Sequence, residues 1–181
     1  LRTWAFSLSD TNYVPHPVLS PKEVLWDIRY RKEDSQYYYS GYRGDHYGTK
    51  ELNEESGVQI FFRRSKDGFH WTDDKESEIY RGGGSELSFD WNAQGDLFGV
   101  MRLDDGDQRG WGSLLTKKTR TSQLFQFPTE ADPQRFDSPR MFRMGKELFL
   151  LARQNIYQGD ETKNAPYDLN FLGDKDKKLS E

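Results

Sequence analysis

The sequence predicts an all-β protein of the β-propeller class, and two observations support this prediction. An acidic residue is followed sixteen positions later by an arginine three times, and successive copies start 59 and 51 residues apart. The three couplets are Asp27/Arg43, Glu86/Arg102 and Asp137/Arg153. Within each copy, apolar and polar residues alternate around a polar turn, which is typical of a two-strand hairpin. A β-rich repeat of about fifty residues is typical of propeller blades, which are small sheets that stack on their neighbours.

The repeat also sets the predicted domain organisation. Three blades are expected at about residues 24–80, 83–130 and 134–175. Because propellers close with about four to eight blades, residues 1–181 are predicted to form one partial propeller domain of a five- or six-bladed ring. The remaining blades would come from the same protein or from another chain. A plain β-sandwich is the main rival for a chain of many short strands and turns.

Composition excludes several classes of function. The net charge is −4 and the pI is near 5.5, so no basic face is expected for nucleic acid. No apolar run is long enough to span a bilayer. The absence of cysteine excludes disulfides, thiol catalysis and cysteine-ligated zinc. No metal site and no cofactor are predicted, and the compartment stays open, with a secreted or periplasmic location favoured.

The first repeat is predicted to begin with an inner strand over residues 24–31, after a connection punctuated by prolines. The apolar and aromatic residues at even positions alternate with Leu25 and then charged residues at odd positions, so Asp27, Arg29 and Arg31 are expected on one face. The polar segment 44–57 is too long for a simple turn and is a candidate binding loop.

The outer strands follow in order. Residues 58–65 are predicted to form a strand that turns tightly at Ser65-Lys66-Asp67-Gly68 and returns as a strand through Phe69 and Trp71. In the second repeat, the outer strands follow the hairpin 86–102, and a turn is expected at Thr116-Lys117-Lys118-Thr119. Residues 128–135 then connect to the third hairpin.

Two segments carry a resemblance to a known family. The segment SKDGFHW at residues 65–71 resembles the Asp-box of sialidases and related bacterial-neuraminidase-repeat propellers, in which Ser, Asp, Gly and Trp close an outer hairpin. The segment GSELSFDWNAQGDLFGVMR is similar to the sialidase segment that pairs a glutamate with an arginine. The resemblance covers roughly residues 24–155. It implies a sialidase-like β-propeller that acts as a glycoside hydrolase and binds an anionic sugar at the mouth of the channel.

The resemblance also implies roles for particular residues. Similar enzymes clamp the substrate carboxylate with three arginines, which would be Arg29, Arg102 and either Arg140 or Arg143, with Arg140 preferred. An aspartate serves as acid/base, which would be Asp45.

The nucleophile of these enzymes is a tyrosine activated by a glutamate, as in other sialidases. Glu86 would be that glutamate. The tyrosine stays open between Tyr157, Tyr167 and a position outside this sequence.

Two other readings stay open. Asp27, Glu86 and Asp137 open three successive inner strands, so they resemble the carboxylate trio of five-bladed glycosidases that act on arabinans or fructans. Alternatively, the couplets are structural ion pairs, and the propeller is a non-catalytic module for glycan binding or assembly. Arg29 and Arg140 break the repeat, and a cation on an inner strand is costly unless an anion meets it.

Overall fold

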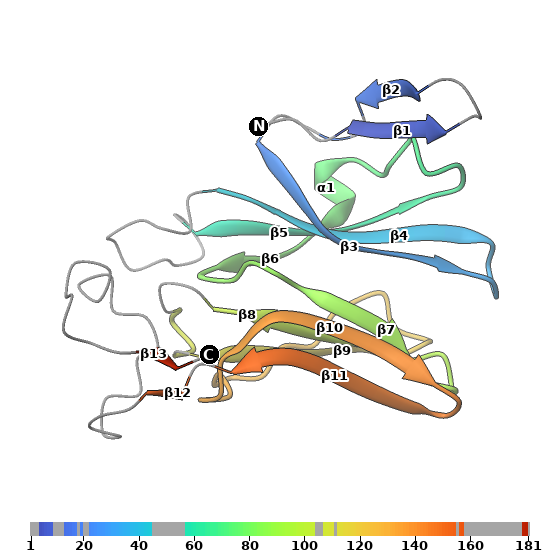
Figure 1. Cartoon of the computed structure of the whole chain (residues 1–181). Helices are drawn as coiled ribbons and strands as arrows, with labels where there is room; N and C mark the ends of the chain where they lie inside the picture. The colour runs from blue at the N-terminus through green and yellow to red at the C-terminus, as the bar shows by residue number, and fades with distance from the viewer. Residues whose placement is uncertain are drawn as a thin grey trace.

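The chain is an all-β protein built from antiparallel sheets, none of which closes on itself among the described residues (Figure 1). The computed structural model describes residues 4–8, 13–17, 19, 22–44, 57–103, 107–110, 112–154, 156–157 and 179–180. Its first sheet contains the strands β3 (Glu23–Arg31), β4 (Gln36–Arg43), β5 (Val58–Ser65) and β6 (Glu78–Gly82), paired in chain order. The second contains β7 (Ser88–Trp91), β8 (Leu97–Arg102) and β9 (Ser113–Lys118). The third contains β10 (Phe136–Met144) and β11 (Glu147–Gln154).

Two smaller ribbons complete the described strands. The strands β1 (Trp4–Leu8) and β2 (Tyr13–Pro17) form an antiparallel pair beside the first sheet. The strands β12 (Ile156–Tyr157) and β13 (Leu179–Ser180) form a second short pair. The three predicted hairpins are confirmed as β3–β4, β7–β8 and β10–β11.

The inner strand β3 departs from the predicted alternation at one residue. Leu25 pairs with Gly41 and Asp27 with Ser40, so Trp26 is an extra residue in a β-bulge. A Cβ on Gly41 would lie 2.6 Å from the Val24 carbonyl oxygen, which explains the glycine beside the bulge. Beyond the bulge, the expected common face of Asp27, Arg29 and Arg31 is confirmed by the register.

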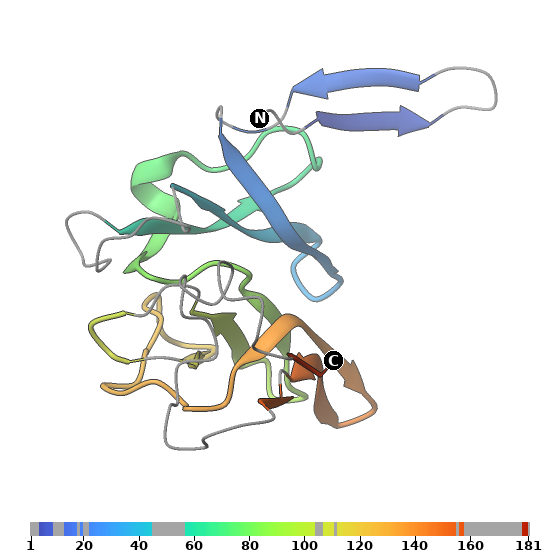
Figure 2. The same ribbon diagram turned by 60° about the vertical axis from the view of Figure 1, so that its left-hand side comes forward.

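The main sheets are stacked in chain order, as Figures 1 and 2 show. Apolar side chains of the first two sheets fill the space between them and remove a large apolar area from water. One cluster joins Tyr42, Ile60 and Tyr80 of the first sheet to Leu87, Met101 and Leu114 of the second region. Another is built on Phe89, Trp91 and Leu97, with Tyr38 and Phe62 packed against it. On the other side of the second sheet, β10 contacts β7 and β8.

Two predicted outer segments differ from the structure. The return after the tight turn is not a strand at Phe69 and Trp71, because a short helix α1 (Asp74–Ser77) intervenes and β6 begins at Glu78. The Trp71 ring meets the Tyr39 ring edge-on at 4.6 Å, and Asp73 caps α1.

The second difference lies in the second sheet. The turn predicted at residues 116–119 is wrong in position, since β9 continues to Lys118 and the chain turns at Thr119–Ser122. An isolated bridge between Lys117 and Gln126 follows that turn.

Candidate functional site

The first strands of the three main sheets meet through one serine. β7 contacts both β3 and β10, and Ser88 lies on β7. Its hydroxyl donates to Asp27 Oδ2 at 2.5 Å and accepts from the Met141 amide at 2.8 Å. Ser88 is fully buried and Asp27 is nearly so. The Ser88 side chain on β7 therefore joins β3 and β10, the first strands of the other two sheets.

Arg29 makes a second connection between the same strands. Its Nη2 donates to Asp27 Oδ2 at 3.1 Å and to the Met141 carbonyl at 2.6 Å. Its Nε donates to the Phe89 carbonyl at 3.3 Å. About 30% of the side chain stays exposed. The cation that breaks the sequence repeat is thus met by Asp27 and by two backbone carbonyls, which compensate much of the cost of its burial.

The predicted residues Glu86, Arg102 and Asp137 lie together in a second group. Arg102 Nη1 donates to Glu86 Oε1 at 2.9 Å, and its Nε lies 3.0 Å from Asp137 Oδ1. Arg135 also donates to Asp137 Oδ1, at 2.6 Å. Asp137 is 1% exposed, and Arg102 is 8% exposed. Arg102 thereby bridges the acid of its own hairpin and the acid of the next hairpin.

A bulge in β10 completes this group. The register of β10 shifts between Asp137 and Arg140, and Ser138 takes a positive φ of 48°. A non-glycine residue in this region carries backbone strain of about 1–3 kcal/mol. The Ser138 amide donates to Glu86 Oε2 at 3.0 Å. Both Glu86 oxygens are therefore held, one by Arg102 and one by the strained backbone.

Arg140 lies outside both groups. Its guanidinium carbon is 4.4 Å from the centre of the Trp26 ring, which makes a cation–π contact between β10 and the β3 bulge. Among the described residues, its one side-chain hydrogen bond runs from Nη1 to the Pro139 carbonyl, at 3.3 Å. Arg140 is exposed, and Trp26 Nε1 is buried and has no hydrogen-bond partner in the described part of the chain.

The other sequence candidates are placed as follows. Asp45 and Tyr167 lie outside the described residues, and Tyr157 is described only as backbone of β12. Arg143 is exposed, and its Nη1 donates to the Asn92 carbonyl at 3.3 Å. The Arg43 side chain does not pair with Asp27, as the couplet suggests, but with Asp74 at 2.7 Å.

Sequence reasoning missed Ser88, Arg135 and Ser138 as members of these groups. Ser88 could have been singled out, because it occupies the repeat position at which the first copy has Arg29. No repeat signal marks Arg135, which precedes the third couplet. The role of Ser138 depends on a bulge that no local pattern specifies.

A third network lies on the opposite face of the first sheet. Arg63 donates to both Glu23 oxygens, at 2.9 and 2.8 Å, and also pairs with Asp74. Burial alone would raise the pKa of Asp74. Hydrogen bonds from Arg63 and Arg43 outweigh this effect and hold the pKa below its usual value. Burial, and then the Glu23 charge, raise the pKa of the Tyr39 hydroxyl, which donates to Glu23. Arg63 and Asp74 of this network, which are already paired with each other, also line a concave region of about 510 Å³.

The tight turn after β5 is closed by side-chain bonds. Ser65 Oγ donates to Asp67 Oδ1 at 2.9 Å, and that same oxygen accepts from the amides of Phe69 and His70. The bonds from His70 and Phe69 hold the pKa of Asp67 well below its usual value. Gly68 has a φ of +80°, which favours glycine at this position.

Comparison with known proteins adds no relative. The sequence matches no protein-family model and no curated protein. Among the described residues, no group of three or more His, Asp or Glu side chains is arranged to hold a metal ion. The one helix in the described part of the chain, α1, is too short to cross a bilayer.

Proposed function

We propose that this chain is part of a sialidase-type β-propeller that binds a carbohydrate carrying a carboxylate. The stacked antiparallel hairpins and the turn at Ser65–Gly68 support the architecture. The binding contact is proposed at Arg140 and Trp26, with the partly exposed Arg29 next to them along β3. Aromatic rings suit the apolar faces of sugars, and a guanidinium suits a carboxylate.

One observation supports this assignment above the others. Of the three arginines assigned to the clamp, only Arg140 lacks a carboxylate partner within the described residues. Arg29 and Arg102 already bind Asp27, Glu86 and Asp137. Arginines that are already paired with carboxylates have few free N–H donors for a ligand. An exposed guanidinium that is positioned by an indole ring keeps its donors available for a carboxylate.

The test is a binding titration of N-acetylneuraminic acid followed by NMR. We expect Arg140→Gln to weaken binding about tenfold or more, the loss of a charge-assisted hydrogen bond. Arg143→Gln is the matched comparison, because Arg143 lies on the same strand, is exposed, and has a guanidinium with no carboxylate partner among the described residues. Equal affinities for both variants and the unmodified protein would remove the proposed contact. Weaker binding in the Arg143 variant alone would assign the contact to Arg143 instead of Arg140.

Glycoside hydrolysis is the second proposal, and the position of Glu86 favours it. Glu86 keeps about 12% of its side chain exposed and lies 2.9 Å from Arg102, so the pair that the resemblance assigns to one catalytic site is together. Release of the aryl alcohol from an aryl sialoside measures the activity. We expect Glu86→Gln to abolish it while N-acetylneuraminic acid still binds. Turnover unchanged in that variant would exclude the glutamate from the chemistry.

A further inference from the structure

A concave region lies between the first and second sheets, at the end where the hairpins turn. It has a volume of about 550 Å³. Four cationic residues line it: Arg31 from β3, Arg64 from β5, Lys118 from β9 and Arg120 from the turn that follows β9. Two carboxylates, Asp34 and Glu76, also line it. We call this region the turn-end cleft.

The cations of the turn-end cleft are poorly compensated. Within the described residues, the side chains of Lys118 and Arg64 have no hydrogen bond and no ion pair; Lys118 Nζ only lies 5.5 Å from the Phe125 ring. Arg31 binds Asp34 through Nη1 at 3.3 Å, and its Nε lies 3.9 Å from Glu33 Oε2 as an ion pair, but within the described residues that buried Nε has no hydrogen-bond partner. Burial, and then the charges of Arg64 and Arg31, lower the pKa of Lys118. Like charges thus crowd one another across three strands.

The surrounding residues keep this arrangement in place. Gly95 in the β7–β8 turn has a φ of +87°, and a Cβ there would lie 3.3 Å from Arg31 Nη2 and 3.4 Å from Arg120 Cδ. Arg31 is also held over the Trp91 ring at 5.1 Å. Asp34 accepts from the Tyr38 hydroxyl at 2.8 Å, so this carboxylate is engaged twice.

Crowded cations in a half-buried cleft are unfavourable unless an anion joins them. Three cationic side chains that approach from different strands suit a tetrahedral oxyanion, whose several oxygens can each accept a bond. The cleft is much larger than a single anion, and its wall includes the aromatic side chains of Tyr38, Phe62, Trp91 and Phe125. Its size and wall suit an oxyanion attached to a ring.

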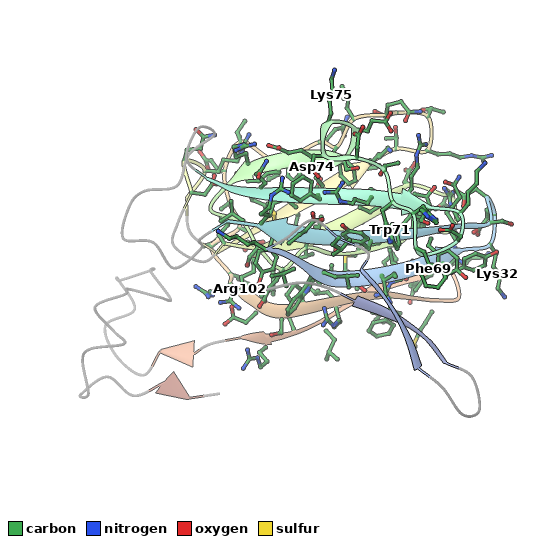
Figure 3. All side chains as sticks on the ribbon, turned by 90° about the horizontal axis from the view of Figure 1, so that it is seen from above. Lys32, Phe69, Trp71, Asp74, Lys75 and Arg102 are labelled. Atoms are coloured by element: carbon green, nitrogen blue, oxygen red, sulfur yellow. The ribbon has the colours of Figure 1, made fainter. Side chains whose placement is uncertain are left out.

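We propose that the turn-end cleft is a binding site for a sulfate or phosphate ester of a small ring-containing molecule, with Arg31, Arg64 and Lys118 as its ligands. This site is distinct from the group around Glu86 and Arg102. In Figure 3, Lys32, the neighbour of Arg31, and Phe69 lie at one end of the sheets, and Arg102 lies at the other. The proposal therefore does not depend on the function proposed above.

The test compares glucose 6-sulfate, glucose 6-phosphate and glucose by isothermal titration calorimetry at constant ionic strength. We expect saturable binding of at least one ester and none of glucose. Lys118→Gln and Arg64→Gln should each weaken that binding about tenfold or more, as the loss of a charged hydrogen bond requires. Lys146→Gln is the control, because Lys146 is exposed in the β10–β11 turn.

Each result decides the proposal. Tighter binding of one ester supports the site and identifies its ligand as a sulfate ester or a phosphate ester. Binding that is equal in Lys118→Gln, Arg64→Gln and Lys146→Gln would show non-specific attraction and overturn the site. Absence of saturable binding of both esters to the unmodified protein would overturn it as well. Arg64 is exposed, so its variant tests the site even if Lys118→Gln folds poorly.

Discussion

The two ends of the stacked sheets contain similar charged residues, which are paired with carboxylates at one end and largely unpaired at the other. At the end that holds Arg102, this arginine meets the carboxylates of Glu86 and Asp137, and Glu86 also accepts from the Ser138 amide. At the turn end, Lys118 and Arg64 meet no carboxylate within the described residues. The same residue types therefore serve to join sheets at one end and are left available at the other. What distinguishes them is pairing, which depends on neighbouring sheets and not on the local sequence.

The largest effect that tests this comparison is expected at Arg102. Arg102→Met leaves Glu86 and the buried Asp137 without the cation between them, so the free energy of unfolding should fall by about 3–5 kcal/mol. Urea denaturation followed by tryptophan fluorescence measures this change. Arg140→Met is the control, and it should cost about 1 kcal/mol or less, since it loses the contact with Trp26 and one long bond to the Pro139 carbonyl but no ion pair. Similar losses in both variants would contradict the contrast between paired and available arginines.

A smaller loss is expected when the hydroxyl between the inner strands is removed. Ser88→Ala leaves the Met141 amide without its acceptor and Asp27 without one donor, which should cost about 1–3 kcal/mol. Thr121→Ala, at an exposed turn, provides the reference. Hydrogen exchange of the Met141 amide should become faster in the serine variant. Unchanged exchange there would mean that the serine does not join the strands.

A pH dependence extends the comparison to an exposed carboxylate. The pKa of Asp67 is lowered in the folded protein, so its contribution to stability is present above the usual carboxyl value, about 3.9, and is lost as the pH falls towards the lowered value. Stability should therefore decrease below about pH 4, and Asp67→Asn should reduce that decrease. Thermal unfolding between pH 7 and 2 measures it. Identical profiles for the two proteins would remove the assigned role of the turn.

The smallest expected effect concerns Lys118. Because its pKa is lowered, the folded protein disfavours the charged form, and stability should rise as the pH approaches the usual lysine value of about 10.4. Lys118→Gln should leave the free energy of unfolding at pH 7 unchanged or raise it by up to about 0.5 kcal/mol. The variant should also lack the rise at high pH. A clear destabilisation would indicate that the lysine is structurally paired after all.

Local patterns were sufficient for the hairpins. Alternation and turn residues are properties of short segments, so the strand pairs that follow Asp27, Glu86 and Asp137 could be predicted. The bulges at Trp26 and Ser138 could not, because they serve contacts with other sheets. Likewise, the late start of β6 accompanies the packing of Trp71 on Tyr39, which no local pattern shows.

The candidate site was predictable within one hairpin but not across hairpins. The couplet spacing indicates that Arg102 belongs with Glu86, and this is the pair the structure has. Its second partner, Asp137, is in another hairpin, and only the stacking of sheets brings them together. The sequence did not predict Lys118 as a cleft residue, because it was assigned to a turn at residues 116–119. When β9 extends to this residue, alternation turns the side chain into the cleft.

The sharing of Arg102 between two hairpins has a consequence for how the molecule is made. Synthesis proceeds from the N-terminus, so residues 88–118 leave the ribosome before residues 136–154. Until β10 docks, Arg102 has Glu86 but not Asp137, and Ser88 has Asp27 but not the Met141 amide. Each finished repeat thus presents a half-satisfied surface that its successor completes. We therefore expect that deleting or exchanging one repeat would leave buried polar groups of its neighbour without partners.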